Sequence, residues 1–200
     1  LGIARARQHL TDHSRGEVIL PLDDDDVLDP LAVSRFLRAT AARPWAGIVR
    51  ARRQFIDDAG DPLPMTDWFA FERRQYIDGA TIDITNHSQP YCIRRSVLAA
   101  AGGWAGFADF EYMGEDCGCF MRVEEHADIE LIDEVLYYYR MHDQRTSLRF
   151  EQRDADEMWR RIADESLARR QLDLKRINDQ PPFAYERLPI RAAQVSSAVA

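Results

Sequence analysis

Four consecutive aspartates, at positions 23 to 26, follow directly on the apolar run of residues 18–22. Adjacent carboxylates at the end of a buried strand repel one another unless a cation or hydrogen-bond donors compensate their charge. Oxygen ligands suit Mn²⁺ or Mg²⁺, and such an ion commonly bridges protein carboxylates to substrate phosphates. The run therefore predicts a divalent-metal loop. The alternative is a solvated acidic loop, because runs of charge are common on protein surfaces.

A second acidic pair, Glu115 and Asp116, stands at the predicted start of a helix. Apolar residues repeat behind this pair at helical spacing, and we expect the helix to end near His126. The N-terminus of a helix favours the ionised form of an acid. The pattern therefore predicts an ionised carboxylate at this position.

The elements around the first acidic run alternate between helix and strand. Residues 5–13 suit a helix, residues 18–22 a buried strand, and Asp29-Pro30 the start of a second helix. The apolar stripe of that second helix is expected at Leu31, Val33, Phe36 and Leu37. This alternation favours an α/β fold with a mainly parallel sheet flanked by helices, in which ligands lie beyond the carboxyl ends of the strands.

Further elements are expected along the rest of the chain. We predict strands at residues 46–55, 91–93, 129–132 and 135–139, and a short helix at 95–101 that ends at Gly102-Gly103. Residues 64–89 have no clear period and indicate a long loop region. We divide the chain into a domain of residues 1–150 and a charged helical extension of residues 151–200, broken at Pro181-Pro182.

Composition limits the classes of partner. The formal net charge is −8, which argues against nucleic acid as a partner, because proteins that bind phosphate backbones carry a basic face. No apolar run is long enough to span a bilayer. We expect a cytoplasmic protein, with membrane association through another part of the protein as the alternative. The three cysteines are expected to be reduced and mostly buried.

Several motifs occur in a definite order. They are Ala6-Arg7-Gln8 and Gly16-Glu17 ahead of the aspartates, Gly102-Gly103-Trp104, Gly114-Glu115-Asp116 with Arg122 behind it, and Tyr139-Arg140 with His142, Thr146 and Ser147. Over residues 4–147 this order resembles glycosyltransferase family 2, whose members are inverting enzymes with the GT-A fold. Gln8 stands where the family has Asn, and Gly118 stands where it often has an acidic residue.

The resemblance implies transfer of a sugar from a nucleotide-sugar donor to an acceptor hydroxyl. Asp116 would act as the general base, with Glu115 orienting it or serving merely as an acid of the first turn. Asp25 would coordinate Mn²⁺ or Mg²⁺, and Asp23 would contact the nucleotide ribose or the metal shell, with Asp24 beside it in the nucleotide-sugar site.

Other matched residues receive roles in the same way. Arg7 and Arg140 would contact the diphosphate, or for Arg7 the base, and His142 would bind the metal or the diphosphate. Gly103, Trp104 and Arg122 would lie against the acceptor. Each of these side chains also has a structural interpretation: a solvated arginine, a core histidine or a buried tryptophan.

The partners implied are a UDP- or GDP-sugar donor and a glycan, lipid-linked or protein acceptor. The resemblance starts partway through the family's nucleotide-binding segment, so we expect this chain to lack the opening βαβ unit. Self-association, as in a homo-oligomer, would then cover an exposed sheet edge.

Two other functions fit part of the pattern. A metal-dependent phosphohydrolase would use Asp23 to Asp26 but would leave Glu115 and Asp116 unexplained. A truncated domain that keeps the metal loop would be a binding module without catalysis.

Overall fold

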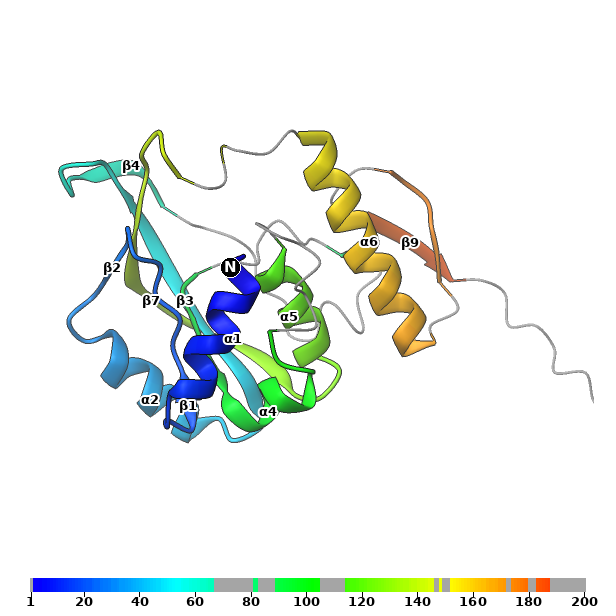
Figure 1. Cartoon of the computed structure of the whole chain (residues 1–200), viewed down its shortest axis with the longest axis horizontal. Helices are drawn as coiled ribbons and strands as arrows, with labels where there is room; N and C mark the ends of the chain where they lie inside the picture. Colours follow the sequence, from blue (N-terminus) through cyan, green and yellow to red (C-terminus); the bar gives the residue numbers. More distant parts are fainter. Residues whose placement is uncertain are drawn as a thin grey trace, which may run out of the picture.

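A computed structural model of the chain describes residues 2–66, 81–82, 89–104, 114–145, 148, 152–171, 174–179 and 183–187 (Figure 1). Most of the loop region predicted at residues 64–89, together with Thr146, Ser147 and Pro181-Pro182, lies outside the described residues.

Six strands of the described residues form the sheet at the centre of the molecule. In spatial order it consists of β1 (Val18–Ile19), β6 (Tyr91–Arg94), β3 (Ala46–Ile56), β7 (Asp128–Arg140) and β2 (Val27–Leu28), with β4 (Pro62–Thr66) paired to β3. The longest ladder, between β3 and β7, is parallel, and the other described pairings in this sheet are antiparallel. The predicted α/β fold class is confirmed, with a mixed sheet.

The strand β7 runs through a position where the sequence predicts a break. Residues 129–132 and 135–139 are expected as two strands, whereas β7 is continuous from Asp128 to Arg140. The register shifts between Arg50 and Arg52, whose partners are Leu131 and Val135. The exposed acidic residues Asp133 and Glu134 therefore sit in a bulge, which interrupts the alternating pattern without ending the strand.

The apolar run before the aspartates forms less strand than expected. Its strand part, β1, has two residues and is half-buried, and Leu22 is exposed. Because β1 lies at one edge of the sheet, it pairs on one side with β6 and has no described neighbour on its other side.

Helices pack against the sheet and against one another. They are α1 (Ile3–His13), α2 (Ala32–Ala42), α4 (Arg95–Ala100), α5 (Glu115–Val123) and α6 (Gln152–Arg170). The positions of α1, α4 and α5 agree with the sequence predictions to within a few residues.

The apolar stripe predicted for α2 is wrong in part. Phe36 is buried, but Leu31, Val33 and Leu37 are 55%, 55% and 51% exposed. The buried positions are Ala32, Phe36, Ala39 and Thr40, which repeat at helical spacing on a neighbouring face. Three of these four side chains are small. A search for large apolar residues therefore does not identify this face of the helix as the buried one.

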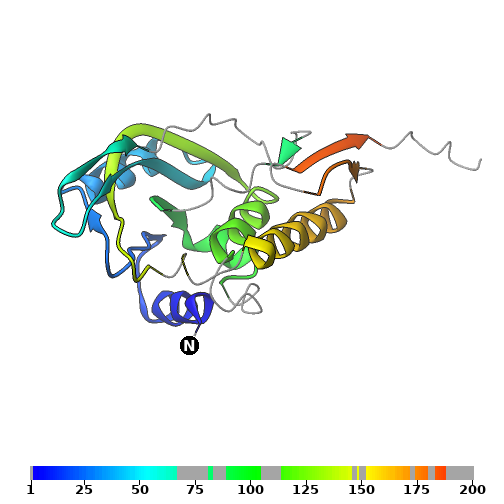
Figure 2. The ribbon, with the colours of Figure 1, turned by 90° about the horizontal axis from the view of Figure 1, so that it is seen from above.

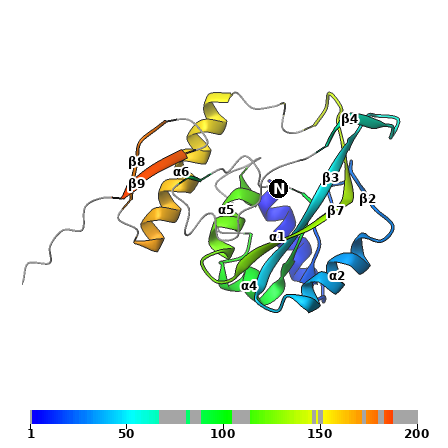
Figure 3. The same cartoon turned by 180° about the vertical axis from the view of Figure 1, so that it is seen from behind.

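The helix α6 belongs to the same packed body. It lies beside α5, at the end of the molecule away from β2 and β4 (Figures 1, 2 and 3). Its Ile162, Ala163 and Leu167 are buried in the core that α4 and α5 form against the sheet. Next to α6 is a small sheet of β5 (Thr81–Ile82), β9 (Phe183–Arg187) and β8 (Leu174–Arg176).

No helix in the described part of the chain has both the length and the hydropathy needed to cross a bilayer.

Candidate active site

Arg7, on the inner face of α1, connects the two acidic motifs. Its Nη2 donates to Oδ1 of Asp23 at 3.1 Å, and its Nη1 lies 2.7 Å from Oε1 of Glu115. The same Nη1 donates to Oδ1 of Asp116. Asp23 and Asp116 are 93 residues apart in the chain, so the fold brings both predicted acidic motifs to one guanidinium.

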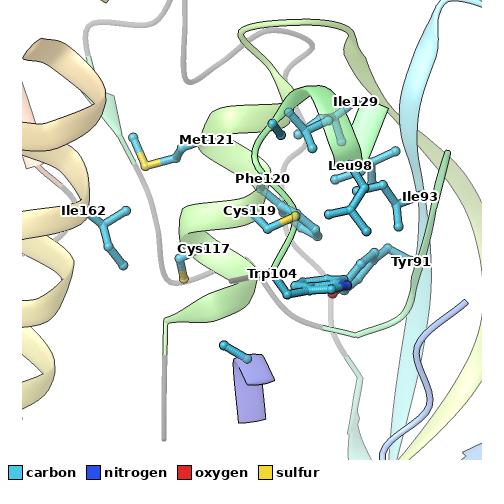
Figure 4. Close-up of a cluster of buried hydrophobic side chains, with 14 of the residues drawn as sticks. Tyr91, Ile93, Leu98, Trp104, Cys117, Cys119, Phe120, Met121, Ile129 and Ile162 are labelled. Carbon is cyan, nitrogen blue, oxygen red and sulfur yellow. The ribbon is translucent and has the colours of Figure 1, made fainter. Parts of the chain in front are cut away.

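Two aromatic residues complete this cluster. The hydroxyl of Tyr91, in β6, donates to Oδ1 of Asp116 at 2.5 Å. The guanidinium of Arg7 lies 5.5 Å from the ring centroid of Trp104, within the range of a cation–π contact. Figure 4 shows Tyr91 and Trp104 side by side below α5. Sequence reasoning missed Tyr91, because a tyrosine at the start of a buried strand has the pattern of an ordinary core residue.

Three carboxylates surround a single arginine, so the negative charge of the cluster is not fully compensated. Burial opposes the charge of Arg7, but Asp116, Glu115 and Asp23 hold the pKa of its guanidinium well above the usual value. Burial, and then the charge of Asp116, raises the pKa of Glu115 to about 7. Burial also raises the pKa of Asp23, an effect that Arg7 opposes.

The end of β7 holds the loop of Asp23 to Asp26, here called the aspartate loop, in place. Oδ2 of Asp26 accepts from the Tyr137 hydroxyl at 2.7 Å, and its Oδ1 accepts from the Arg140 backbone N–H at 2.7 Å. Burial raises the pKa of Asp26 to about 6, although both hydrogen bonds act in the opposite direction. Asp26 is thus a structural anchor, a role that sequence reasoning did not assign to it.

Arg140 has the same anchoring character. Its Nε donates to the carbonyl oxygen of Asp25 at 2.9 Å, and its Nη1 donates to the carbonyls of Asp57 and Asp58 at 3.0 and 2.9 Å. These bonds tie the aspartate loop to the turn between β3 and β4. The predicted contact of Arg140 with a diphosphate stays a prediction, and the described contacts engage much of the guanidinium.

Asp25 and His142 are the residues best placed to hold a metal. Nε2 of His142 lies 2.8 Å from Oδ2 of Asp25, and both side chains are partly exposed. No group of three or more His, Cys, Asp or Glu side chains that could hold a metal ion occurs among the residues that the structure describes. The carboxylate of Asp25 suits Mg²⁺ or Mn²⁺ when phosphate and water oxygens supply the remaining ligands, and the imidazole of His142 is a nitrogen donor beside it. Asp23 is already paired with Arg7, and Asp24 is exposed.

The residues predicted to bind an acceptor are placed differently from one another. Trp104 is 0% exposed, and its Nε1 donates to Thr11 at 3.1 Å. Trp104 thus supports Arg7 and α1, and it is also among the residues that line the groove described below, so its contact with an acceptor stays a prediction. Gly103 lies in the turn after α4, where Oε1 of Gln8 accepts from the Trp104 backbone N–H at 2.7 Å.

Arg122 is separated from the cluster. It lies in the last turn of α5, six residues after Asp116, which corresponds to about 9 Å along a helix axis. An acceptor that contacts both Asp116 and Arg122 would have to extend over that distance. The role of Arg122 stays a prediction.

A groove of about 670 Å³ runs between α1 and the segment from Gly16 to Asp24. Its walls are mostly apolar, with Ile3, Leu10, Ile19 and Leu20 among the lining residues. Arg7, Asp23 and Asp24 line it as well, so the groove borders the acidic cluster. A mostly apolar cleft with a few convergent charged groups is typical of a site for a small ligand.

Comparison with known proteins gives a family and several distant structural likenesses. Residues 1–100 match the family model described as glycosyl transferase family 2. The comparison with curated proteins returned no match.

The solved structures that resemble the chain include three at 12–14% sequence identity. S. aureus TarS 1–349 has a TM-score of 0.46, with 84% of this chain and 52% of that chain covered. A mycobacterial protein has a TM-score of 0.49, with 94% and 61% covered. Glucosyl-3-phosphoglycerate synthase from Mycobacterium tuberculosis, in complex with Mg²⁺ and uridine diphosphate, has a TM-score of 0.48, with 94% and 63% covered. The chain thus spans 52 to 63% of the length of these proteins.

The family match covers α1, the aspartate loop, α2, β3, β6 and α4, and so includes Arg7, Asp23 and Asp25 of the site described above. Because the match takes in half of the 200 residues, this chain belongs to glycosyl transferase family 2.

Proposed function

We propose that this chain carries the catalytic part of a metal-dependent, inverting glycosyltransferase that uses a nucleotide-sugar donor. The observation that supports this best is the bridge from Asp23 through Arg7 to Asp116 at the edge of the groove. In this proposal Asp116 is the carboxylate that accepts a proton and the loop of Asp23 to Asp26 binds the diphosphate, and the bridge through Arg7 supports a shared site. We assign this function to residues 1–150 and treat residues 151–200 as an extension, whose helix α6 packs against α5.

In this proposal Asp116 removes the proton from the acceptor hydroxyl. The acceptor oxygen forms a bond to the anomeric carbon from the face opposite the leaving group. The bond between that carbon and the diphosphate oxygen breaks, and its electron pair leaves with the nucleoside diphosphate. A single displacement of this kind inverts the configuration at the anomeric carbon, and a positioned base typically contributes about 10²- to 10⁴-fold to such a step.

The donor side of the site is assigned to the aspartate loop and its neighbours. Asp25 and His142 would hold Mn²⁺ or Mg²⁺, an ion that neutralises charge developing on a leaving diphosphate when it is bound. Asp23 and Arg7 would position the nucleotide in the groove, with the exposed Asp24 at its rim. The base is expected to be uracil or guanine, and the acceptor to be a glycan, a lipid-linked sugar or a protein.

Calorimetric titration with UDP and with GDP tests the donor site directly. We expect one of them to bind in the presence of Mn²⁺ and to be released by a chelator. If a folded sample binds neither nucleotide, the donor-site assignment fails for this chain.

The variant Asp116→Asn tests the base separately from donor binding. We expect sugar transfer to fall by at least about 100-fold, because Asn cannot accept a proton, while metal-dependent nucleotide binding is retained. Asp133→Asn, at an exposed position in the β7 bulge, is the matched control and should transfer at the wild-type rate. Full transfer by Asp116→Asn would remove Asp116 as the base.

The variant His142→Ala tests the metal site. Loss of one of the two described donors should weaken Mn²⁺-dependent nucleotide binding by at least about 10-fold. His126→Ala, which removes an exposed histidine after α5, serves as the control. Equal nucleotide affinity in the His142 variant and the control would contradict the assignment of His142 as a metal ligand.

A further inference from the structure

Tyr91 is buried beside the proposed base, and the mechanism proposed for sugar transfer gives it no role. Its side chain is 0% exposed and packs edge to face on Phe120, with ring centroids 4.7 Å apart at 85°. The ring of Trp104 lies on another side at 6.4 Å. The hydroxyl of Tyr91 donates to Oδ1 of Asp116 at 2.5 Å.

The two oxygens of the Asp116 carboxylate are not equivalent. Oδ1 accepts from both Tyr91 and Arg7. Within the described part of the chain, no hydrogen bond engages Oδ2. A carboxylate held through one oxygen keeps a fixed orientation and presents the other oxygen for a reaction.

We infer that Tyr91 is a positioning residue, which fixes Oδ1 of Asp116 so that Oδ2 is the oxygen that receives the acceptor proton. This inference rests on the proposed function of Asp116 as the base. The acceptor O–H bond breaks, its proton goes to Oδ2, and the acceptor oxygen uses the freed electron pair to bond to the anomeric carbon. Oδ1 keeps its two hydrogen bonds throughout.

Arg7 by itself does not orient the carboxylate uniquely. Its guanidinium is shared among Asp116, Glu115 and Asp23, so each of these acids competes for the same donors. The Tyr91 hydroxyl, in contrast, is carried by a ring that is packed on Phe120 and Trp104. Burial, and then the charge of Asp116, raises the pKa of Tyr91 well above its usual value, so the hydroxyl stays a donor.

The variant Tyr91→Phe removes the hydroxyl and keeps the ring. We expect kcat for transfer to fall by about 10- to 100-fold, because a base that is misplaced by a fraction of an ångström reacts poorly. KM for the donor should stay unchanged, since the aspartate loop is not altered. Tyr138→Phe, which removes a hydroxyl 3.4 Å from Asp29, is the matched control and should keep the wild-type kcat.

A spectroscopic measurement on the same proteins is independent of activity. A short hydrogen bond to a carboxylate should give the Tyr91 hydroxyl a slowly exchanging, downfield proton resonance. This signal should be present in the wild type and in Tyr138→Phe, absent in Tyr91→Phe, and displaced in Asp116→Asn.

The outcomes separate the inference from the proposed function. The positioning role is overturned if kcat is unchanged in Tyr91→Phe, or if kcat falls equally in Tyr138→Phe. It is also overturned if the wild-type spectrum lacks the resonance of the hydroxyl proton. A wild-type chain that binds nucleotide but transfers no sugar to any acceptor overturns the proposed function, and with it the catalytic meaning of Tyr91. The hydroxyl signal would then still establish the contact with Asp116.

Discussion

At the scale of single residues, the cluster around Arg7 pairs one positive guanidinium with more than one negative carboxylate. One guanidinium faces three carboxylates, and two of these, Glu115 and Asp116, are adjacent in the chain and buried. Two like charges in a buried site raise the pKa of one partner. Glu115 is that partner, with its pKa at about 7. The charge state of the cluster therefore changes within the neutral pH range.

This arrangement predicts how stability depends on pH. The folded pKa of Glu115 lies above its ordinary value of 4.5, so the folded state binds the proton more tightly than the unfolded state. The free energy of unfolding should therefore fall as pH rises from about 4.5 to about 7, by on the order of 1–3 kcal/mol, and then become constant.

Glu115→Gln tests this by removing the titrating group. Urea unfolding at pH 5 and pH 8 should show a smaller difference for the variant than for the wild type, and the variant should be the more stable of the two at pH 8. Glu134→Gln, at an exposed site paired with Arg35, should keep the wild-type difference. A wild type that is more stable than Glu115→Gln at pH 8 would show that the ion pair with Arg7 outweighs burial and repulsion.

At the scale of secondary structure, the start of α5 is the junction that places the acidic pair. Gly114 precedes the helix with φ of +83°, a conformation that L side chains rarely adopt. A Cβ at this position would lie 2.5 Å from Sδ of Met158 and 3.1 Å from Cδ1 of Ile162, both on α6. The turn that aims Glu115 and Asp116 at Arg7 thus also allows α6 to approach α5.

We expect Gly114→Ala to destabilise the protein more than a strained turn alone would. Backbone strain contributes about 1 kcal/mol and overpacking against α6 about 1–3 kcal/mol more. Gly60→Ala is a matched control, because Gly60 has φ of +94° but no atom within 4 Å of its Cβ position. Denaturant unfolding of both variants measures the difference, and equal losses would show that α6 adjusts without cost.

At the scale of the whole molecule, one core joins the sheet, the site and α6. The buried cluster that contains Tyr91 and Trp104 extends through Phe120 to Ile162 on α6. Figure 4 shows Ile162 reaching from α6 towards Cys117 and Met121 of α5. The helix that carries Asp116 is therefore packed between the sheet and α6, which limits the movement of the base.

This continuity predicts that α6 unfolds together with the sheet. Ile162→Ala should lower the free energy of unfolding by about 2–4 kcal/mol and leave a single transition by circular dichroism and tryptophan fluorescence. Leu37→Ala, at an exposed position of α2, should change it by no more than about 0.5 kcal/mol. An early, separate loss of helix in the Ile162 variant would show instead that α6 is an independent unit.

Local sequence determined the elements and the chemical types in the site. Periodicity and turn residues predict α1, α5, β3 and the end of α4 at Gly102, because these features depend on neighbours within one turn or one strand. The motifs predict the family, and the match over residues 1–100 confirms it. The same motifs identify Arg7, Asp23, Asp25, Asp116 and His142 as candidate site residues.

Tertiary structure alone decided what each side chain contacts. Nothing local indicates that Tyr91 reaches Asp116, or that Asp26 and Arg140 anchor the aspartate loop. The same holds for the exposed face of α2 and the bulge that keeps β7 continuous. These features depend on residues tens of positions apart that the fold brings within a few ångströms, and hydrogen bonding, burial and charge compensation act at that range.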